Sequence, residues 1–158
     1  MKTYAVLCSV LLAVAAGAAQ SDAPIAAGLT VSAPWMRATV PQAKSGGAFM
    51  RLRSASDARL VAIRSDVAGL VEVHQMEMVG QVMKMRAEDG LDLPAGKTVE
   101  LVSGARHLML MDLKRQLKAG EVVALTLVIQ KPDRTRESVL VRVPVMPLTY
   151  SPPPPPPP

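Results

Sequence analysis

Two histidines and a group of methionines are the residues of this chain with the clearest chemical potential. The chain has 158 residues, and His74 and His107 are its two histidines. Each is followed two residues later by a methionine, and Met83-Lys-Met85 lies between the two pairs. Neutral imidazole and thioether, without thiolate, form a ligand set suited to a soft monovalent ion, above all Cu(I). The residue types therefore predict a copper site.

The spacing of these donors suits β-strands, in which residues two apart share a face. Three donor pairs have this spacing: His74 with Met76, Met83 with Met85, and His107 with Met109. If three strand ends lie side by side, six soft donors can face one small volume. Their convergence is an expectation that a structure can test.

Methionine on a strand is more often core filling than a ligand. We therefore expect core positions for four methionines: Met36, Met50, Met78 and Met146. Met83 and Met111 lean towards the core, yet together with Met76 they could border the site. A histidine on a strand is also usually structural, but here both histidines coincide with sulfur at matching spacing, which favours binding.

Cysteine is confined to Cys8, inside the apolar N-terminal run. A thiolate pair in an oxidising compartment is prone to form a disulfide, so thioethers suit a Cu(I) protein there. A mature chain without cysteine excludes a blue-copper centre, whose equatorial ligand is a cysteine sulfur, and also a Cys-His catalytic pair. The acidic residues of the region fit solvated strand edges and turns: Glu72, Glu77, Glu88, Asp89 and Asp92. We expect no enzyme.

Length and composition bound the class of protein. A chain of this length supports one domain with a sizeable core. Nearly half of the residues are apolar but only 3% are aromatic, so the core must be aliphatic. The formal charge is +5, yet basic residues are scattered singly and few aromatic residues are available to stack on bases. This pattern argues against a nucleic-acid binder and favours a solvated basic surface.

The N-terminus has the pattern of a secretory signal peptide. A short basic start precedes an apolar run from Tyr4 to Ala16, which is too short to cross a membrane. Small residues then allow cleavage after Ala18 or Ala19. A lipoprotein signal would place Cys8 at the end of the apolar run, but the run continues past it. We expect an exported, periplasmic protein that is soluble, without stable membrane insertion, and monomeric.

From Leu29 onward, short apolar segments alternate with turn residues about every eight to twelve positions, which is typical of an antiparallel Greek-key barrel or sandwich. We expect an all-β fold of about eight or nine strands, with Leu29 to Ser32 as the first strand and Pro34 to Arg37 as an edge or bulge that begins the second. The expected divisions are a signal peptide (1–19), a lead-in (20–27), the β-barrel domain (28–148) and a proline-rich tail (149–158). The seven final prolines favour an extended polyproline II spacer.

Three of the expected strands carry the candidate ligands. Leu70 to Met78 and Gln81 to Arg86 should form a hairpin, and Arg106 to Asp112 should form the third strand. Apolar residues at alternate positions should pack behind the donors: Val71, Val73, Leu108 and Leu110. The donors are then expected on the opposite face.

The spacing of four of the donors resembles a known signature. His74, ten residues, Met85, twenty-one residues and His107-x-Met109 resemble the H-x10-M-x21-H-x-M pattern of the periplasmic copper chaperone family PCuAC. Five further segments look like parts of that family: Pro34 to Thr39, Gly47 to Met50, Gly80 to Arg86, Gly104 to Met109 and Gly120 to Leu127. The likeness covers roughly residues 28 to 146.

The resemblance implies a cupredoxin-like β-barrel that binds one Cu(I) through His74, Met85, His107 and Met109. It also implies delivery of copper to the binuclear CuA centre on subunit II of cytochrome c oxidase, or to another periplasmic acceptor. Some family members carry a C-terminal extension rich in histidine and methionine that can bind Cu(II). The proline tail of this chain departs from that pattern.

The expected mechanism is ligand exchange. Thioethers bind Cu(I) without losing a proton, whereas each imidazole must be neutral to bind, so affinity should weaken as the pH falls through the range in which histidine is protonated. Two other functions stay open. One is a periplasmic copper-buffering or resistance protein with the same site. The other is a metal-free exported β-sandwich that binds a protein through an adaptable methionine patch.

Overall fold

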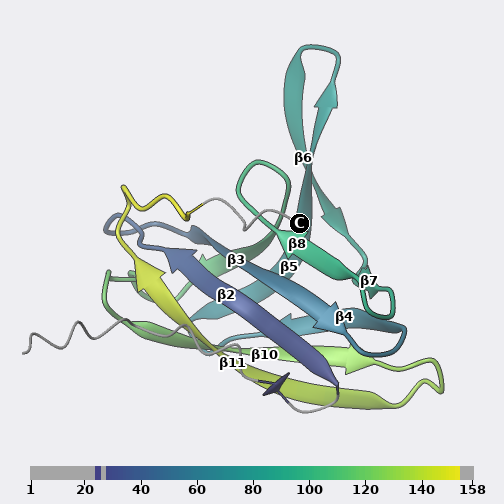
Figure 1. Cartoon of the computed structure of the whole chain (residues 1–158). Coiled ribbons are helices and arrows are strands. Elements are labelled where there is room, and N and C mark those ends of the chain that lie inside the picture. Colours follow the sequence, from purple (N-terminus) through teal and green to yellow (C-terminus); the bar gives the residue numbers. More distant parts are fainter. Residues whose placement is uncertain (1–23, 26–27, 154–158) are drawn as a thin grey trace, which may run out of the picture.

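The computed structural model describes residues 24–25 and 28–153, a β-structure in which none of these residues is helical (Figure 1). Its strands are β1 (Pro24–Ile25), β2 (Leu29–Arg37), β3 (Ser45–Ser54), β4 (Ala58–Arg64), β5 (Ala68–Val79), β6 (Val82–Glu88), β7 (Leu91–Leu93), β8 (Thr98–Leu101), β9 (Arg106–Leu113), β10 (Val122–Gln130) and β11 (Arg136–Met146). The predicted signal peptide, Cys8 and the last five prolines lie outside the described residues. The described part holds no helix of the length and apolarity that a membrane span requires.

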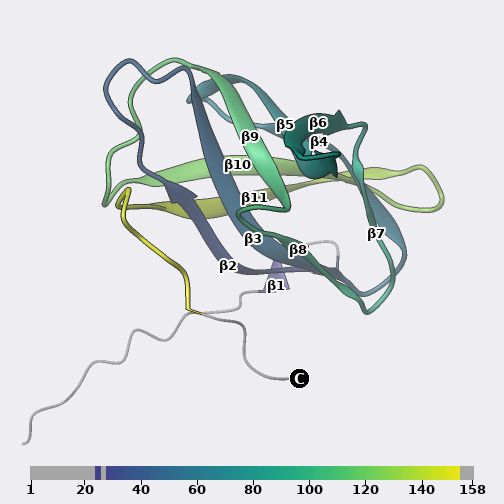
Figure 2. The ribbon, with the colours of Figure 1, turned by 90° about the horizontal axis from the view of Figure 1, so that it is seen from above.

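Seven of the strands close into a barrel. Their order is β2-β11-β10-β4-β5-β9-β3, and β3 returns to pair with β2. The ring is antiparallel except between β2 and β11, which run parallel where Met36 meets Val145. Figure 2 looks down on the barrel from above. The all-β barrel predicted from the sequence is confirmed.

The barrel interior is aliphatic, as the composition predicted. Alternate residues of each strand enter one core cluster, among them Val71 and Val73 of β5 and Leu108 and Leu110 of β9. Each such side chain contributes about 1.5–3 kcal/mol by leaving water. The aromatic rings of Trp35 and Phe49 are buried but lie outside this cluster. The face opposite the core is therefore where the remaining side chains of β5 and β9 must lie.

Two details of the strands differ from the prediction. The segments 29–32 and 34–37, expected to belong to successive strands, are one strand, β2, whose register with β3 shifts between Ser32 and Trp35. A bulge with Ala33 at a positive φ of 46° accommodates the proline there, so the strand bends but does not end. The short strand β7 was not predicted, because three residues are too few to show alternation.

The β5–β6 hairpin extends beyond the barrel and rises above it in Figure 1. β9 pairs with β5 only as far as Gln75, whereas β6 pairs with β5 up to Val79. The outer half of the hairpin therefore has strand partners only within itself. Gly80, at a φ of 67°, begins a two-residue turn of the kind that needs glycine at its first position.

Candidate metal centre

His74 and His107 lie directly opposite each other on neighbouring strands. They are register partners between β5 and β9, so both side chains project from the same face of the sheet. Their ring centroids are 6.2 Å apart, with the ring planes inclined at 60°. An imidazole nitrogen binds a metal at about 2.0–2.1 Å, so rings at this separation leave room for one ion between them. His107 is buried, with 6% of its surface exposed, and His74 is half-buried.

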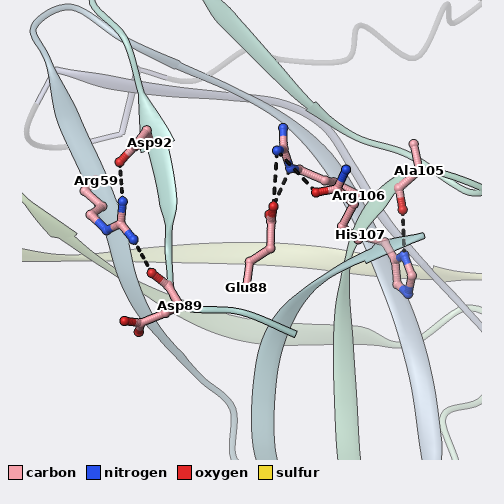
Figure 3. Close-up of polar contacts among 8 residues, drawn as sticks. Arg59, Glu88, Asp89, Asp92, Ala105, Arg106 and His107 are labelled. Carbon is pink, nitrogen blue, oxygen red and sulfur yellow. Dashed lines mark hydrogen bonds and ion pairs between the residues drawn. The ribbon is translucent and has the colours of Figure 1, made fainter. Parts of the chain in front are cut away.

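Each histidine has one ring nitrogen engaged by the protein. Nε2 of His74 lies 3.0 Å from Oε2 of Glu72. Figure 3 shows the contact of the other ring, in which Nδ1 of His107 lies 3.2 Å from the carbonyl oxygen of Ala105. A carbonyl oxygen and an ionised carboxylate can only accept, so the proton of each neutral ring resides on the engaged nitrogen. The free lone pairs are then on Nδ1 of His74 and Nε2 of His107.

The free nitrogen of His74 has no protein partner. Nδ1 is buried and no described residue offers it a hydrogen bond. An unpaired buried polar atom is costly unless something else binds it. A ring whose other nitrogen donates to a carboxylate or a carbonyl has the arrangement that metal-binding histidines use to fix tautomer and orientation.

Two methionines share the face of the histidine pair. Met109 follows His107 by two residues and is opposite Glu72 on β5 and Gly47 on β3. Met85 is opposite Met76, one step farther along β5 than His74. The donors predicted on three strands thus lie on one continuous face formed by β6, β5 and β9. Among the described residues no three His, Cys, Asp or Glu side chains gather as a metal site, and the soft donors that share this face are imidazoles and thioethers.

The two methionines differ in their surroundings. Met109 is partly buried against the barrel wall, whereas Met85 keeps 48% of its surface exposed on the hairpin. Of the predicted neighbours, Met76 is partly buried beside Met85, Met111 is partly buried farther along β9, and Met83 is exposed nearer the hairpin tip.

The core positions predicted for other methionines are only partly right. Met36 and Met50 are buried in the core, and Met146 is partly buried. Met78 is 59% exposed, so its predicted core position is wrong. Met83, which leaned towards the core, is also exposed. The reason is that the outer half of the hairpin has left the barrel, so strand alternation there faces solvent on both sides.

An aromatic wall, for which the sequence pattern predicted no role, borders the site. Phe49 lies with its ring centroid 6.2 Å from that of His107 and stacks on Trp35 at 4.3 Å. Tyr150 meets Trp35 edge-on at 5.0 Å. A side chain at Gly47 would approach the Phe49 ring to 3.1 Å, so glycine there lets the ring lie against β3 beside Met109.

Three acidic residues that were expected to be solvated have side-chain partners, and two of them, Glu72 and Glu88, lie beside the histidines. Glu72 holds His74, as described above, and Glu88 accepts two hydrogen bonds from Arg106 at 2.8 and 3.1 Å (Figure 3). Because Glu88 is on β6 and Arg106 on β9, this pair spans β5 and ties the base of the hairpin to the strand of His107. The role of Glu72 could have been predicted from its position two residues before His74, because residues two apart on a strand share a face.

The segment that leads from the hairpin back to the barrel is held by a separate set of contacts. Arg59 of β4 donates to the carboxylate of Asp92 at 2.5 Å and to the carbonyl of Asp89 (Figure 3). Between them Gly90 has a φ of 85°, and a Cβ there would lie 2.7 Å from the carbonyl oxygen of Leu60. The hairpin base is therefore fixed from both sides, and only its outer half is free of the barrel.

Comparison with known proteins shows the family to which this chain belongs. A family model described as "Putative lipoprotein LpqE-like" matches residues 29–145. The chain belongs to the LpqE-like family. A curated relative, "Putative lipoprotein Lxx21020" of Leifsonia xyli subsp. xyli, is 30% identical over 110 residues. That match covers 69% of this chain and 66% of the relative, so the chain spans about two thirds of the relative's length. LpqE-like membership indicates an exported protein, periplasmic or membrane-associated.

Solved structures show that the fold of this LpqE-like chain is similar to that of PCuAC domains. The apo PmoF2 PCuAC domain matches with a TM-score of 0.65 at 21% identity, over 80% of this chain and 96% of that one. Apo-DR1885 of Deinococcus radiodurans matches with a TM-score of 0.54 at 28% identity, over 92% and 95% of the two chains. Its Cu(I)-bound form matches with a TM-score of 0.52 at 26% identity, over 82% of each. The predicted PCuAC resemblance and the cupredoxin-like barrel are confirmed.

Proposed function

We propose that the protein is a periplasmic copper chaperone. It binds one Cu(I) through His74, Met85, His107 and Met109 and transfers the ion by ligand exchange to an acceptor such as the CuA site of cytochrome c oxidase. The observation that carries the proposal is the cross-strand histidine pair, in which each ring has one nitrogen held by the protein and the other free. The likeness to Cu(I)-bound DR1885 supports copper as the cargo.

The donor set suits a carrier of Cu(I). Thioethers bind a soft ion without releasing a proton, and neutral imidazoles complete a set that contains no oxidisable thiol. Glu72 and the Ala105 carbonyl orient the two rings before copper arrives, which lowers the reorganisation that binding requires. The aromatic wall of Phe49 and Trp35 limits water on the His107 side.

The exposed donor supplies the exit. Met85 lies on the hairpin with half of its surface in solvent, so an acceptor ligand can replace it first. Copper would then be held by the acceptor together with the histidines and Met109 until these are replaced in turn. Neither a proton nor an electron is transferred in this exchange, so copper stays Cu(I) throughout.

A Cu(I) competition titration under anaerobic conditions tests the binding half of the proposal. We expect one tightly bound Cu(I) per wild-type chain and its loss in the double variant His74→Ala/His107→Ala. Near-ultraviolet circular dichroism of both proteins would confirm that the barrel remains folded. Tight one-to-one binding of unchanged affinity by the double variant would overturn the ligand assignment. A wild-type protein that takes up no Cu(I) would favour the metal-free binding module.

A transfer assay tests the chaperone half. The Cu(I)-loaded protein is mixed with an apo CuA domain, and the two are separated and analysed for copper. Transfer that is faster than release into a chelator of matched affinity supports direct ligand exchange. Transfer that only equals the rate of release would identify a copper buffer.

A further inference from the structure

The outer half of the β5–β6 hairpin separates its side chains into two different faces. On one face, Met76 is paired with Met85 and Met78 with Met83. On the other face, Gln75 is paired with Arg86 and Glu77 with Lys84. Cross-strand partners project to the same side, so four thioethers form a two-step ladder that continues the face of His74 outward.

The outer step of this methionine ladder (Met76, Met78, Met83 and Met85) is not part of a core. Met78 and Met83 are 59% and 52% exposed, at a point where β5 and β6 pair only with each other. Exposed apolar side chains gathered on a projecting element usually mark a binding function. The selection of methionine at all four positions adds a chemical property, the soft thioether sulfur, that valine or leucine would not supply.

We propose that Met78 and Met83, with a thioether of the inner step as third donor, form a second, weaker Cu(I) site at the hairpin tip. Directly opposed residues have Cβ atoms about 4.5–5.5 Å apart, within reach of two flexible thioethers that bind one ion. Successive steps are about 6.6 Å apart along the strand, so a third methionine can join from either strand. The inference rests on the proposed function, for which this tip site is the entrance and exit.

The two sites differ in strength for a chemical reason. The tip offers only neutral thioethers on a solvated ribbon, whereas the barrel site adds two oriented imidazoles in a largely buried setting. Copper is therefore held briefly at the tip and more tightly at the barrel. Met85 belongs to the inner step and to the barrel site, so the ion can pass inward by replacing one thioether at a time. Copper remains Cu(I), and no proton is taken up or released on the ladder.

Methyl signals of methionine distinguish the two sites in one experiment. Protein labelled with 13C at the methionine methyl groups is titrated anaerobically with Cu(I) and followed by NMR. We expect the first equivalent to shift the Met85 and Met109 signals and the second to shift those of Met78 and Met83. Signals of Met78 and Met83 that do not move up to two equivalents would overturn the tip site.

Leucine substitution separates metal binding from apolar docking. Met78→Leu/Met83→Leu conserves volume and apolar character but removes both sulfurs. This variant should lose the second equivalent of Cu(I) and load its barrel site more slowly, with the first equivalent retained. The matched control is Val79→Leu/Val82→Leu, which changes the same tip on its opposite face and should behave as wild type. A second equivalent that survives in the Met78→Leu/Met83→Leu variant would contradict the proposal.

The variant His74→Ala/His107→Ala separates this inference from the proposed function. Shifts of Met78 and Met83 that persist in this variant would support the tip site whether or not the barrel site is the chaperone site. Wild-type protein that shifts only Met85 and Met109 would overturn the tip site and leave the proposed function standing. No shift of any methionine in wild-type protein would contradict both.

Discussion

The barrel wall and the hairpin supply donors of opposite character to one candidate site. His74, His107 and Met109 project from β5 and β9, where both strands are paired on the barrel and backed by buried leucine and valine. Met85 projects from β6, which pairs only with β5 and keeps its outer residues in solvent. The barrel wall formed by β5 and β9 is suited to holding an ion, and the hairpin is suited to exchanging it. A carrier needs both properties, and here they occur on different elements.

Truncation behind the site should show the largest difference between the two regions. Leu108 is fully buried directly behind His107, so Leu108→Ala should lower the free energy of unfolding by about 2–5 kcal/mol. Val82→Ala at the exposed hairpin tip should change it by less than about 0.5 kcal/mol. Urea denaturation of both variants measures this difference. Equal losses would mean that the hairpin is as much a part of the folded core as the wall.

Removal of the buried histidine should have the largest effect on copper. Residues that only orient a ligand are worth about 10- to 100-fold in metal affinity, and a buried imidazole that binds the ion itself should exceed that range, so His107→Ala should weaken Cu(I) binding by more than about 100-fold. Competition with a chromophoric Cu(I) chelator measures the change. A smaller loss of Cu(I) affinity in His107→Ala than in Met85→Leu would contradict the conclusion that the barrel wall holds the ion.

Replacement of the exposed thioether should have a smaller effect. Met85→Leu keeps the volume of the side chain and should lower Cu(I) affinity on the order of tenfold, about 1.4 kcal/mol. Because Met85 is half exposed, the free energy of unfolding should not change measurably. Stopped-flow release into a chelator should be faster than in wild type. Release at the wild-type rate would show that Met85 is not the ligand exchanged first.

Replacement of the carboxylate that orients His74 should have the smallest effect of the four predicted changes. Glu72→Gln keeps an oxygen that can accept from Nε2 of His74 but removes the charge, so affinity should fall by about tenfold or less. Nitrogen NMR of the His74 ring should report a larger population of the other tautomer in the apo protein. Glu77→Gln, on the charged face of the hairpin, is the control and should leave both measurements unchanged.

The fold was predictable where sequence alternation met a core. The strands of His74 and His107 were found with their core-facing residues because valine and leucine there alternate with polar and sulfur-containing residues. Barrel closure through the parallel contact of β2 with β11 was not predictable, because pairing between distant strands has no local pattern. The bulge at Ala33 was read as a strand break for the same reason.

The site was predictable as a set of residues but not as an environment. Spacing identified the four candidate ligands, and the structure brings their strands side by side. Glu72 and Phe49 were missed because their roles depend on neighbours across the sheet and not along the chain. Met78 was assigned to the core because alternation alone does not show where a strand leaves the barrel.

The aromatic wall gives the protein a built-in optical reporter. Trp35 is the one tryptophan of the chain, so the indole fluorescence of the whole protein comes from a single position. Its ring stacks on Phe49, which in turn borders His107. An ion that settles against His107 changes the environment two rings away, so the emission of Trp35 should follow copper loading in real time without any attached dye. Delivery to an acceptor could then be followed as the recovery of Trp35 fluorescence.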